Sequence, residues 1–217
     1  MNRFLKIQQQ ITDSTKFLQS GGFLKNEVCE PKNWDLSLIL PCLCDGNVLD
    51  MGCQGSIILN NCVKMGLVGE KVGIDLVPVP AFPGIQYFVG DITKSKLPSE
   101  NFDFITCLSV IEHGVKAQEL LQECARLLRR NGRLFLTFDY WDPKLDTTGV
   151  YMFGLPYRIL SRLEVEEIVR LGADLGLCLQ NPIDWTTQDK ILKPGYWSPC
   201  NHSYTFGAIE LVKERLS

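Results

Sequence analysis

Short apolar runs alternate with longer amphipathic stretches through the middle of this sequence, between residues 47 and 138. Five such runs predict strands, at residues 48–51, 71–76, 85–89, 102–108 and 133–138. Residues 57–65 and 116–129 predict helices, and Asn131-Gly132 predicts a turn. Strands that alternate with helices form right-handed β-α-β units and a mainly parallel sheet, which predicts an α/β fold. The runs DFITCL and RLFLTF are apolar throughout, as expected of strands covered on both faces.

The two ends of the chain have a different pattern. Apolar residues at helical spacing predict an amphipathic helix over 3–19, stopped by Gly21-Gly22, and a second helix over 33–44. We therefore expect an N-terminal helical cap (1–45) on a main domain (46–217). After Phe138 the alternation breaks into irregular segments at about 139–160 and 176–203. Between them a helix at 161–175 begins with a capping box, and residues 204–212 predict a last strand.

Composition excludes several classes of protein. The 217 residues fit one domain or one domain with a small appendage. A net charge of −3 argues against a nucleic-acid partner, and no apolar run approaches the roughly 18 residues that span a membrane. Nine cysteines without a C-x-x-C pair, together with only two histidines, argue against a metal site. Cysteines in apolar runs and the absence of a signal-peptide pattern at the N-terminus lead us to expect a reducing, cytoplasmic location.

Acidic residues recur where the predicted strands end. Asp50, Asp75, Asp91 and Asp139 each follow or close a strand, and Ser109 follows the fourth. The carboxyl ends of parallel strands share one edge, where ligands bind near the point at which strand order reverses. Like charges placed together cost free energy, so folding alone explains this pattern poorly. We expect a ligand crevice there.

The residue types suit a nucleoside ligand. Glycines at 52 and 55 let the backbone approach a ligand closely, because glycine has no Cβ. Asp75 can accept hydrogen bonds from both hydroxyls of a ribose, and Asp91 can accept one from an adenine amine. Asp50 can orient the turn, or attract a cationic ligand through water.

Five motifs in this order carry a specific resemblance: VLDMGCQGS, VGIDLVP, VGDIT, FDFITCLSVIEHG and LLRRNGRLFLTF. They resemble the successive motifs of the class I S-adenosylmethionine-dependent methyltransferases. The resemblance implies a Rossmann-like seven-stranded mixed sheet, with its last strand antiparallel and helices on its faces. It also implies S-adenosyl-L-methionine as the cofactor and no divalent metal.

The resemblance assigns roles to individual residues. It implies that Gly52 and the adjoining backbone of Cys53 and Gln54 hold the methionine part of the cofactor, with the Cys53 side chain in packing. It implies Asp75 at the ribose with Leu76 beside it, and Ser109 near the sulfonium. The adenine contacts that it implies are Asp91 and Ile92.

The first motif departs from the usual D-x-G-x-G-x-G of the family. Gln54 and Ser56 stand where the pattern has its second and third glycines. Gln54 either hydrogen-bonds the carboxylate of the cofactor or narrows the pocket.

The resemblance implies methyl transfer to an oxygen or nitrogen of a small polar acceptor. Irregular segments 139–160 and 176–203 are expected to form the acceptor site. Their aromatic residues favour a sugar or other secondary metabolite, because aromatic faces stack on flat rings and on the apolar faces of sugars. These residues are Tyr140, Trp141, Tyr151, Tyr157, Trp185, Tyr196 and Trp197.

Two candidates for a general base follow strands four and five. His113 either takes a proton from the acceptor or packs over the cofactor. Asp139, or Asp142 near it, is either a base or part of a solvated loop.

Two other classes of function compete with the methyltransferase prediction. A nicotinamide-dependent oxidoreductase requires G-x-G-x-x-G after the first strand, which GCQGSI does not supply. A non-catalytic methyltransferase-like protein that binds a cofactor or a partner remains an alternative because of Gln54 and Ser56. The oligomeric state stays open, with a homodimer as one option.

Overall fold

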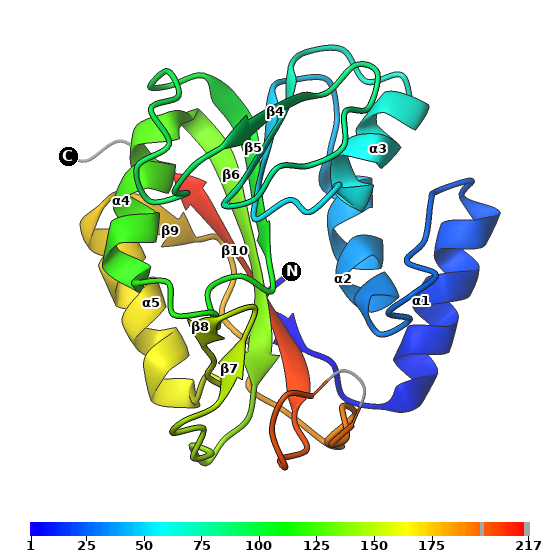
Figure 1. Cartoon of the computed structure of the whole chain (residues 1–217), viewed down its shortest axis with the longest axis vertical. Helices are drawn as coiled ribbons and strands as arrows, with labels where there is room; N and C mark the ends of the chain where they lie inside the picture. Colours follow the sequence, from blue (N-terminus) through cyan, green and yellow to red (C-terminus); the bar gives the residue numbers. More distant parts are fainter. Residues whose placement is uncertain (196–197, 215–217) are drawn as a thin grey trace.

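The structure is a computed structural model that describes residues 1–195 and 198–214. Its main feature is one mixed sheet in the order β1-β10-β6-β5-β2-β3-β4, with β9 paired to β10 (Figure 1). The strands β2, β3, β4, β5 and β6 pair in parallel, whereas β10 runs antiparallel to β6 and β9. The strands of this sheet are β1 (Arg3–Phe4), β2 (Val48–Met51), β3 (Lys71–Asp75), β4 (Gln86–Val89), β5 (Phe102–Leu108), β6 (Leu128–Tyr140), β9 (Leu177–Leu179) and β10 (Thr205–Lys213).

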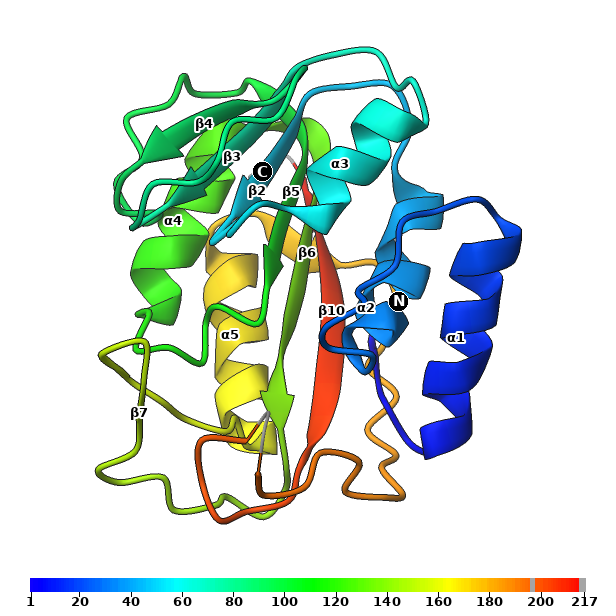
Figure 2. The same cartoon turned by 45° about the vertical axis from the view of Figure 1, so that its right-hand side comes forward.

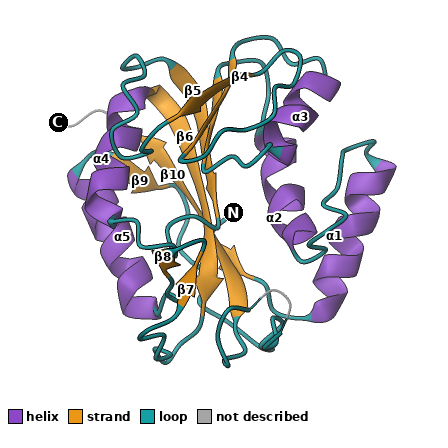
Figure 3. Cartoon of the chain, in the orientation of Figure 1, coloured by secondary structure: helices purple, strands orange, loops and turns teal. Residues whose placement is uncertain are grey.

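Helices cover both faces of the sheet (Figures 1 and 3). One face carries α4 and α5, and the other carries α1, α2 and α3. Both views place α2 between α1 and the sheet (Figure 2). The helices are α1 (Gln8–Ser20), α2 (Lys32–Ile39), the 3-10 turn η1 (Leu40–Cys42), α3 (Ile57–Lys64), α4 (Ala117–Leu127) and α5 (Arg162–Asp174), and a small hairpin joins β7 (Tyr151–Met152) to β8 (Leu155–Pro156). None of the helices in the described part of the chain is long and apolar enough to cross a membrane.

The predicted fold class is confirmed. Strands β2 to β6, β9 and β10 supply the seven expected strands, and the last is antiparallel. The short strand β9 lies in a segment expected to be irregular, because a strand of three residues is too short to show alternation. The fifth strand also extends beyond its predicted ends. Asn131 adopts a left-handed φ of +62° within β6 at a shift in register with β5, where a turn had been expected.

The prediction of one helix over 3–19 is wrong at its start. Phe4 belongs to β1, which pairs with β10, and the amide of Leu5 donates to the carbonyl of Phe206. The helix begins only at Gln8, because the side-chain oxygen of Gln10 accepts hydrogen bonds from the amides of Lys6 and Ile7. Phe4 and Leu5 are fully buried, but as part of the sheet edge. Helical spacing in the sequence cannot distinguish these two ways of burying the same residues.

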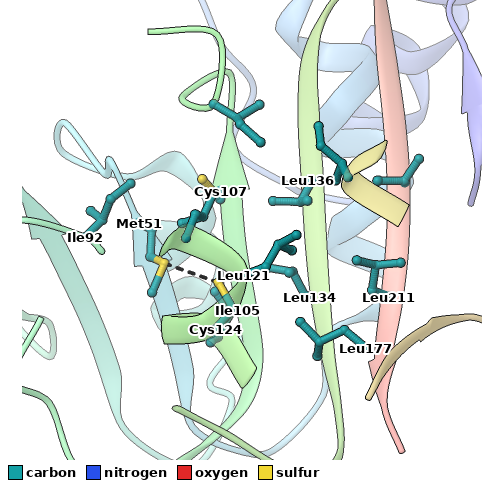
Figure 4. Packing of buried hydrophobic residues seen from close by; sticks show 14 of the residues in the cluster. Met51, Ile92, Ile105, Cys107, Leu121, Cys124, Leu134, Leu136, Leu177 and Leu211 are labelled. Carbon is teal, nitrogen blue, oxygen red and sulfur yellow. Dashed lines mark hydrogen bonds between the residues drawn. The ribbon is translucent and has the colours of Figure 1, made fainter. Parts of the chain in front are cut away.

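Alternate residues of β6 serve the two halves of the core. Leu134 and Leu136 pack on the side of α4 and α5, whereas Phe135 packs with residues of α2 and α3 on the other. Figure 4 shows Leu134 and Leu136 on β6 close to Leu211 on β10. The centre of the sheet is therefore buried on both faces, which fixes the positions of the strand ends there.

We predict that Leu136→Ala lowers the free energy of unfolding by about 2–5 kcal/mol, the usual cost of removing a buried leucine side chain. Leu136 is 0% exposed. Denaturant titration measures the change. Leu163→Ala on α5 is the matched control, since Leu163 is 76% exposed and its loss should cost about 0.5 kcal/mol or less. Equal losses in the two variants would contradict the assignment of Leu136 to the core.

Candidate active site

The order of strands reverses next to β2. From β2 the sheet continues to β3 and β4 on one side and to β5 and β6 on the other. Gly52 follows β2 and Val110 lies just after β5. A Cβ on Gly52 would lie 2.4 Å from Cγ2 of Val110, and its φ is +75°. Only glycine lets the two loops meet here, and a ligand crevice is expected at such a reversal.

The turn after β2 is tied to the end of β3. The amide of Gly52 donates to the carbonyl of Ile74 at 2.8 Å, and the amide of Gln54 donates to Oδ2 of Asp75 at 3.0 Å. Gln54 has a φ of +41°, a left-handed conformation that costs free energy for a residue with a Cβ. Ser56 caps α3, because its Oγ accepts from the amide of Leu59 at 2.9 Å. The departure at Ser56 therefore has a structural function.

Asp50 and Asp75 are both buried beneath this turn. Thr106 Oγ1 donates to Asp50 Oδ1 at 2.6 Å. Burial raises the pKa of Asp50 to about 6, with hydrogen bonds from Ser56 and Thr106 opposing the shift and Asp75 adding to it. Asp75 is 9% exposed and also accepts from the amide of Val77. Carboxylate oxygens have further lone pairs, so Asp75 can still accept from a ligand.

The residues expected at the nucleoside lie in different environments. Leu76 is 57% exposed, which leaves an apolar side chain beside Asp75. Asp91 is exposed and accepts from both the amide and the hydroxyl of Thr93, which lowers its pKa. The side chain of Ile92 packs in the core. Burial raises the pKa of Cys53 to about 12, so its thiol is neutral and suits packing.

A second set of polar residues lies near the carboxyl ends of β5 and β6. Three of them, Ser109, Glu112 and His113, follow β5, and Asp139 lies on β6. Two residues of α2, Lys32 and Asp35, reach the same place. Lys32 Nζ hydrogen-bonds Ser109 Oγ and pairs with Asp35 Oδ2 at 3.0 Å. We call Lys32, Asp35, Glu112 and Asp139 the buried charge cluster.

Burial dominates the electrostatics of this cluster. It lowers the pKa of Lys32, but attraction from Asp35, Asp139 and Glu112 outweighs that effect and raises it. Burial raises the pKa of Asp139 to about 6, although the charge of Lys32 and a hydrogen bond from Tyr157 act to lower it. Burial and the charge of Asp139 raise the pKa of Glu112 to about 8. One ammonium group thus faces three carboxyl groups of unequal acidity.

His113 lies at the edge of the cluster. Its ring packs against Tyr157 and Phe153, with centroids 5.7 and 5.5 Å apart. Burial and the nearby Lys32 lower its pKa, so the imidazole is neutral at pH 7. Its Nδ1 is buried and has no hydrogen-bond partner among the described residues. Tyr157 contacts both His113 and Asp139, so the structure brings the two candidate bases together.

Asp139 lies within β6 and is buried, which rules out a solvated loop at this residue. Asp142 is exposed and accepts from the amide of Arg162 at 3.3 Å. Among the aromatic residues after 139, Tyr140 packs against Phe4 in the core, with the two rings tilted by 31°. Tyr151 is 63% exposed. Tyr196 and Trp197, also expected near the acceptor, lie outside the described residues.

The sequence alone led to no functional role for Lys32, Asp35 or Glu112. Lys32 and Asp35 lie three residues apart, which places them on one face of α2. Asp35 is 0% exposed and lies between the apolar residues Trp34 and Leu36. An acid inside an apolar helical stretch is the signal that could have revealed them.

Comparison with known proteins finds one matching family. Residues 49–136 match the family described as "Methyltransferase domain". A ubiquinone biosynthesis O-methyltransferase of Histophilus somni (strain 2336) is 29% identical over 117 residues, covering 46% of this chain and 49% of that protein. The chain spans about half the length, or less, of the curated relatives that it matches.

Solved structures share the fold. Phosphoethanolamine N-methyltransferase 2 of Haemonchus contortus, in complex with S-adenosyl-L-methionine, aligns with a TM-score of 0.63 at 15% identity over 94% of this chain and 56% of that one. An S-adenosylmethionine-dependent methyltransferase of Mesorhizobium loti aligns with a TM-score of 0.61 at 13% identity over 84% and 97%.

The domain match and the sheet order point to the same class of protein. The match of residues 49–136 is to a methyltransferase domain, and the solved structures that share the fold include S-adenosylmethionine-dependent methyltransferases. The nicotinamide-dependent alternative is thereby set aside.

The raised pKa of Glu112 predicts a pH dependence of stability. A carboxyl group with a raised folded-state pKa stabilises the fold at low pH, and this contribution is lost as pH rises from about 4.5 through about 8. We expect Glu112→Gln to flatten the loss seen in the wild type. The loss of stability between pH about 5 and about 9 should be smaller in the variant than in the wild type by at least ~1.4 kcal/mol, the free energy of one pKa unit.

Denaturant titrations between pH about 5 and about 9 measure this effect. Glu119→Gln is the control, because Glu119 forms an exposed ion pair with Lys116 on the surface of α4. Parallel profiles for wild type and Glu112→Gln would refute the titration of Glu112 in this range.

Proposed function

We propose that the chain transfers a methyl group from S-adenosyl-L-methionine to an oxygen or nitrogen of a small polar acceptor. The observation that carries this proposal is the meeting of the Gly52 turn with the loop after β5 at the reversal of strand order, with His113 on that loop linked through Tyr157 to Asp139 on β6. The cofactor and the general base would then lie next to each other at the carboxyl ends of the parallel strands.

The turn suits the cofactor in its backbone and in its surroundings. A Cβ on Gly55 would have only Val79 within 4 Å, so this face of the turn is open. Leu76 offers an apolar contact beside Asp75, as a nucleoside requires. We assign Gly52, Cys53 and Gln54 to the methionine part, Asp75 and Leu76 to the ribose, and Asp91 with Ile92 to the adenine. Asp50 holds the turn, and Ser109 lies toward the sulfonium.

The bound cofactor supplies a methyl group that its sulfonium already makes reactive. The chain then has to align the acceptor with that methyl group, and proximity and orientation of this kind contribute about 7–11 kcal/mol. A base that takes the acceptor proton adds about 10²–10⁴-fold. His113 suits this role because its imidazole is neutral and its buried Nδ1 lacks a described partner. Asp139 is the second candidate.

The acceptor class is inferred from the surroundings of the site. The names of the curated relatives favour oxygen as the methylated atom. Exposed Tyr151 and partly buried Trp141 suit a ring or a sugar. The net charge of −3 favours a small molecule over nucleic acid, and we place the protein in the cytoplasm.

A specific observation keeps a second function in view. Gln54 stands where the family pattern has a glycine, holds a left-handed φ of +41°, and donates a hydrogen bond from its backbone amide to Asp75. A chain that binds the cofactor without methyl transfer would have this feature too.

Calorimetric titration with S-adenosylmethionine and S-adenosylhomocysteine tests the cofactor. We expect Asp75→Ala to weaken binding of both ligands more than tenfold, since a ribose would lose its acceptor. Asp13→Ala on the exposed face of α1 should bind like wild type. Unchanged affinity in Asp75→Ala would refute the ribose role, and absence of binding to wild type at millimolar cofactor would refute the proposed function.

Transfer of a labelled methyl group to sugars, phenols and amines separates an enzyme from a binding protein. For an accepted substrate, we expect His113→Gln to lower kcat by about 10²–10⁴-fold with little change in cofactor affinity. Cofactor binding without transfer to any acceptor would favour the non-catalytic alternative. If His113→Gln keeps its kcat while Asp139→Asn loses it, the base is Asp139.

A further inference from the structure

The buried charge cluster has an excess of acid. Lys32 is its one ammonium group, and three carboxyl groups act on it. Asp35 and Glu112 are 0% exposed and Asp139 is 6% exposed. Lys32 Nζ also lies 3.9 Å from the centre of the Phe206 ring. The cluster therefore already holds one cation, against carboxylates and an aromatic face.

Two of these carboxyl groups are incompletely satisfied. Neither oxygen of Glu112 meets hydrogen-bond geometry with any described residue, and the same holds for Oδ1 of Asp35. A buried carboxyl oxygen without a hydrogen bond is costly, so the presence of three such oxygens indicates a role beyond folding. Their unused oxygens can stabilise a further positive charge.

The cluster adjoins the proposed cofactor site. Ser109 follows β5 at the reversal of strand order, and its Oγ is the partner of Lys32 Nζ. Glu112 and His113 lie on the same loop, a few residues farther along the chain. A cation bound beside Ser109 therefore takes a position that Lys32 occupies or adjoins.

We propose that the buried charge cluster is the counter-ion of the cofactor's sulfonium, with Lys32 as the internal cation that holds the carboxylates in its absence. The site then distinguishes charged S-adenosylmethionine from neutral S-adenosylhomocysteine by charge. This inference rests on the proposed binding of the cofactor.

Methyl transfer changes the charge of the site. The S–CH₃ bond breaks and its electron pair stays on sulfur, while a lone pair of the acceptor forms the new bond to carbon. The acceptor proton passes to the base, His113 or Asp139, which carries the positive charge until it releases the proton to solvent. The product sulfur is neutral, so after that release the carboxylates have lost a counter-ion and hold the product less tightly than the substrate.

The preference must depend on pH. The groups that act on Glu112 are Lys32 on α2, Asp139 on β6 and Ser109 on its own loop, with Cys107 and Tyr204 also close to it. Asp35, His113 and Cys29 act on or are acted on by Lys32. Asp139 and Glu112 have pKa values of about 6 and about 8, so both gain negative charge as pH rises through this range. Preference for the sulfonium should therefore rise with pH between about 6 and 9.

Two substitutions should shift the preference in opposite directions. The preference is measured as the Kd of S-adenosylhomocysteine divided by the Kd of S-adenosylmethionine. We expect Glu112→Gln to lower this ratio by about tenfold at pH about 8.5 and to flatten its dependence on pH. Lys32→Met removes the competing cation and should raise this ratio by a similar factor. Calorimetry with both ligands measures it.

Lys116→Met and Glu119→Gln are the matched controls, since these residues form an exposed ion pair three residues apart, the spacing of Lys32 and Asp35. A purely structural role would weaken both ligands equally and leave the ratio unchanged, which would overturn the inference while cofactor binding stands. If Glu112→Gln does not fold, the direction in Lys32→Met and the wild-type pH dependence decide. Binding of neither ligand to wild type would refute the proposed function itself.

Discussion

The parallel pairing of β2 with β5 is the constraint on which the rest of the structure depends. It places the Gly52 turn against the loop that begins at Ser109, and it sets the point where the strand order reverses. Both strands are buried on both faces, so neither can slide without exposing apolar side chains. The groups assigned to the cofactor and to proton transfer all lie on or follow strands of this sheet, so their positions depend on this pairing.

The central fold follows from local sequence because its signals are local. Strand β5 has the predicted bounds, and Ser161 and Glu164 form the predicted capping box of α5. Errors arise where burial is achieved by distant contacts. Phe4 and Leu5 are apolar in either a helix or a strand, and only pairing with β10 decides between them. The three residues of β9 likewise form a strand because β10 is there to pair with.

The candidate site divides in the same way. Motifs led to the acids at the strand ends, because each follows directly from a strand boundary. The partners of Asp139 come from elsewhere: Lys32 from α2, and Tyr157 from the segment after β8. Spacing along the chain carries no information about such contacts. The sequence therefore predicts which strand ends meet, but not the buried charges that set the acidity of Glu112 and Asp139.

The contribution of α2 has a consequence for how the chain is divided. The family match covers residues 49–136, and Lys32 and Asp35 both lie before it. The hydroxyl of Thr205 donates a hydrogen bond to the carbonyl of Leu5 at 2.6 Å, which joins the N-terminal segment to the last strand. A fragment cut to the matched segment would keep the glycine turn but lose the only ammonium in the buried charge cluster. Proteins that share this domain and differ before it can therefore share a cofactor while presenting different charges to the methyl group.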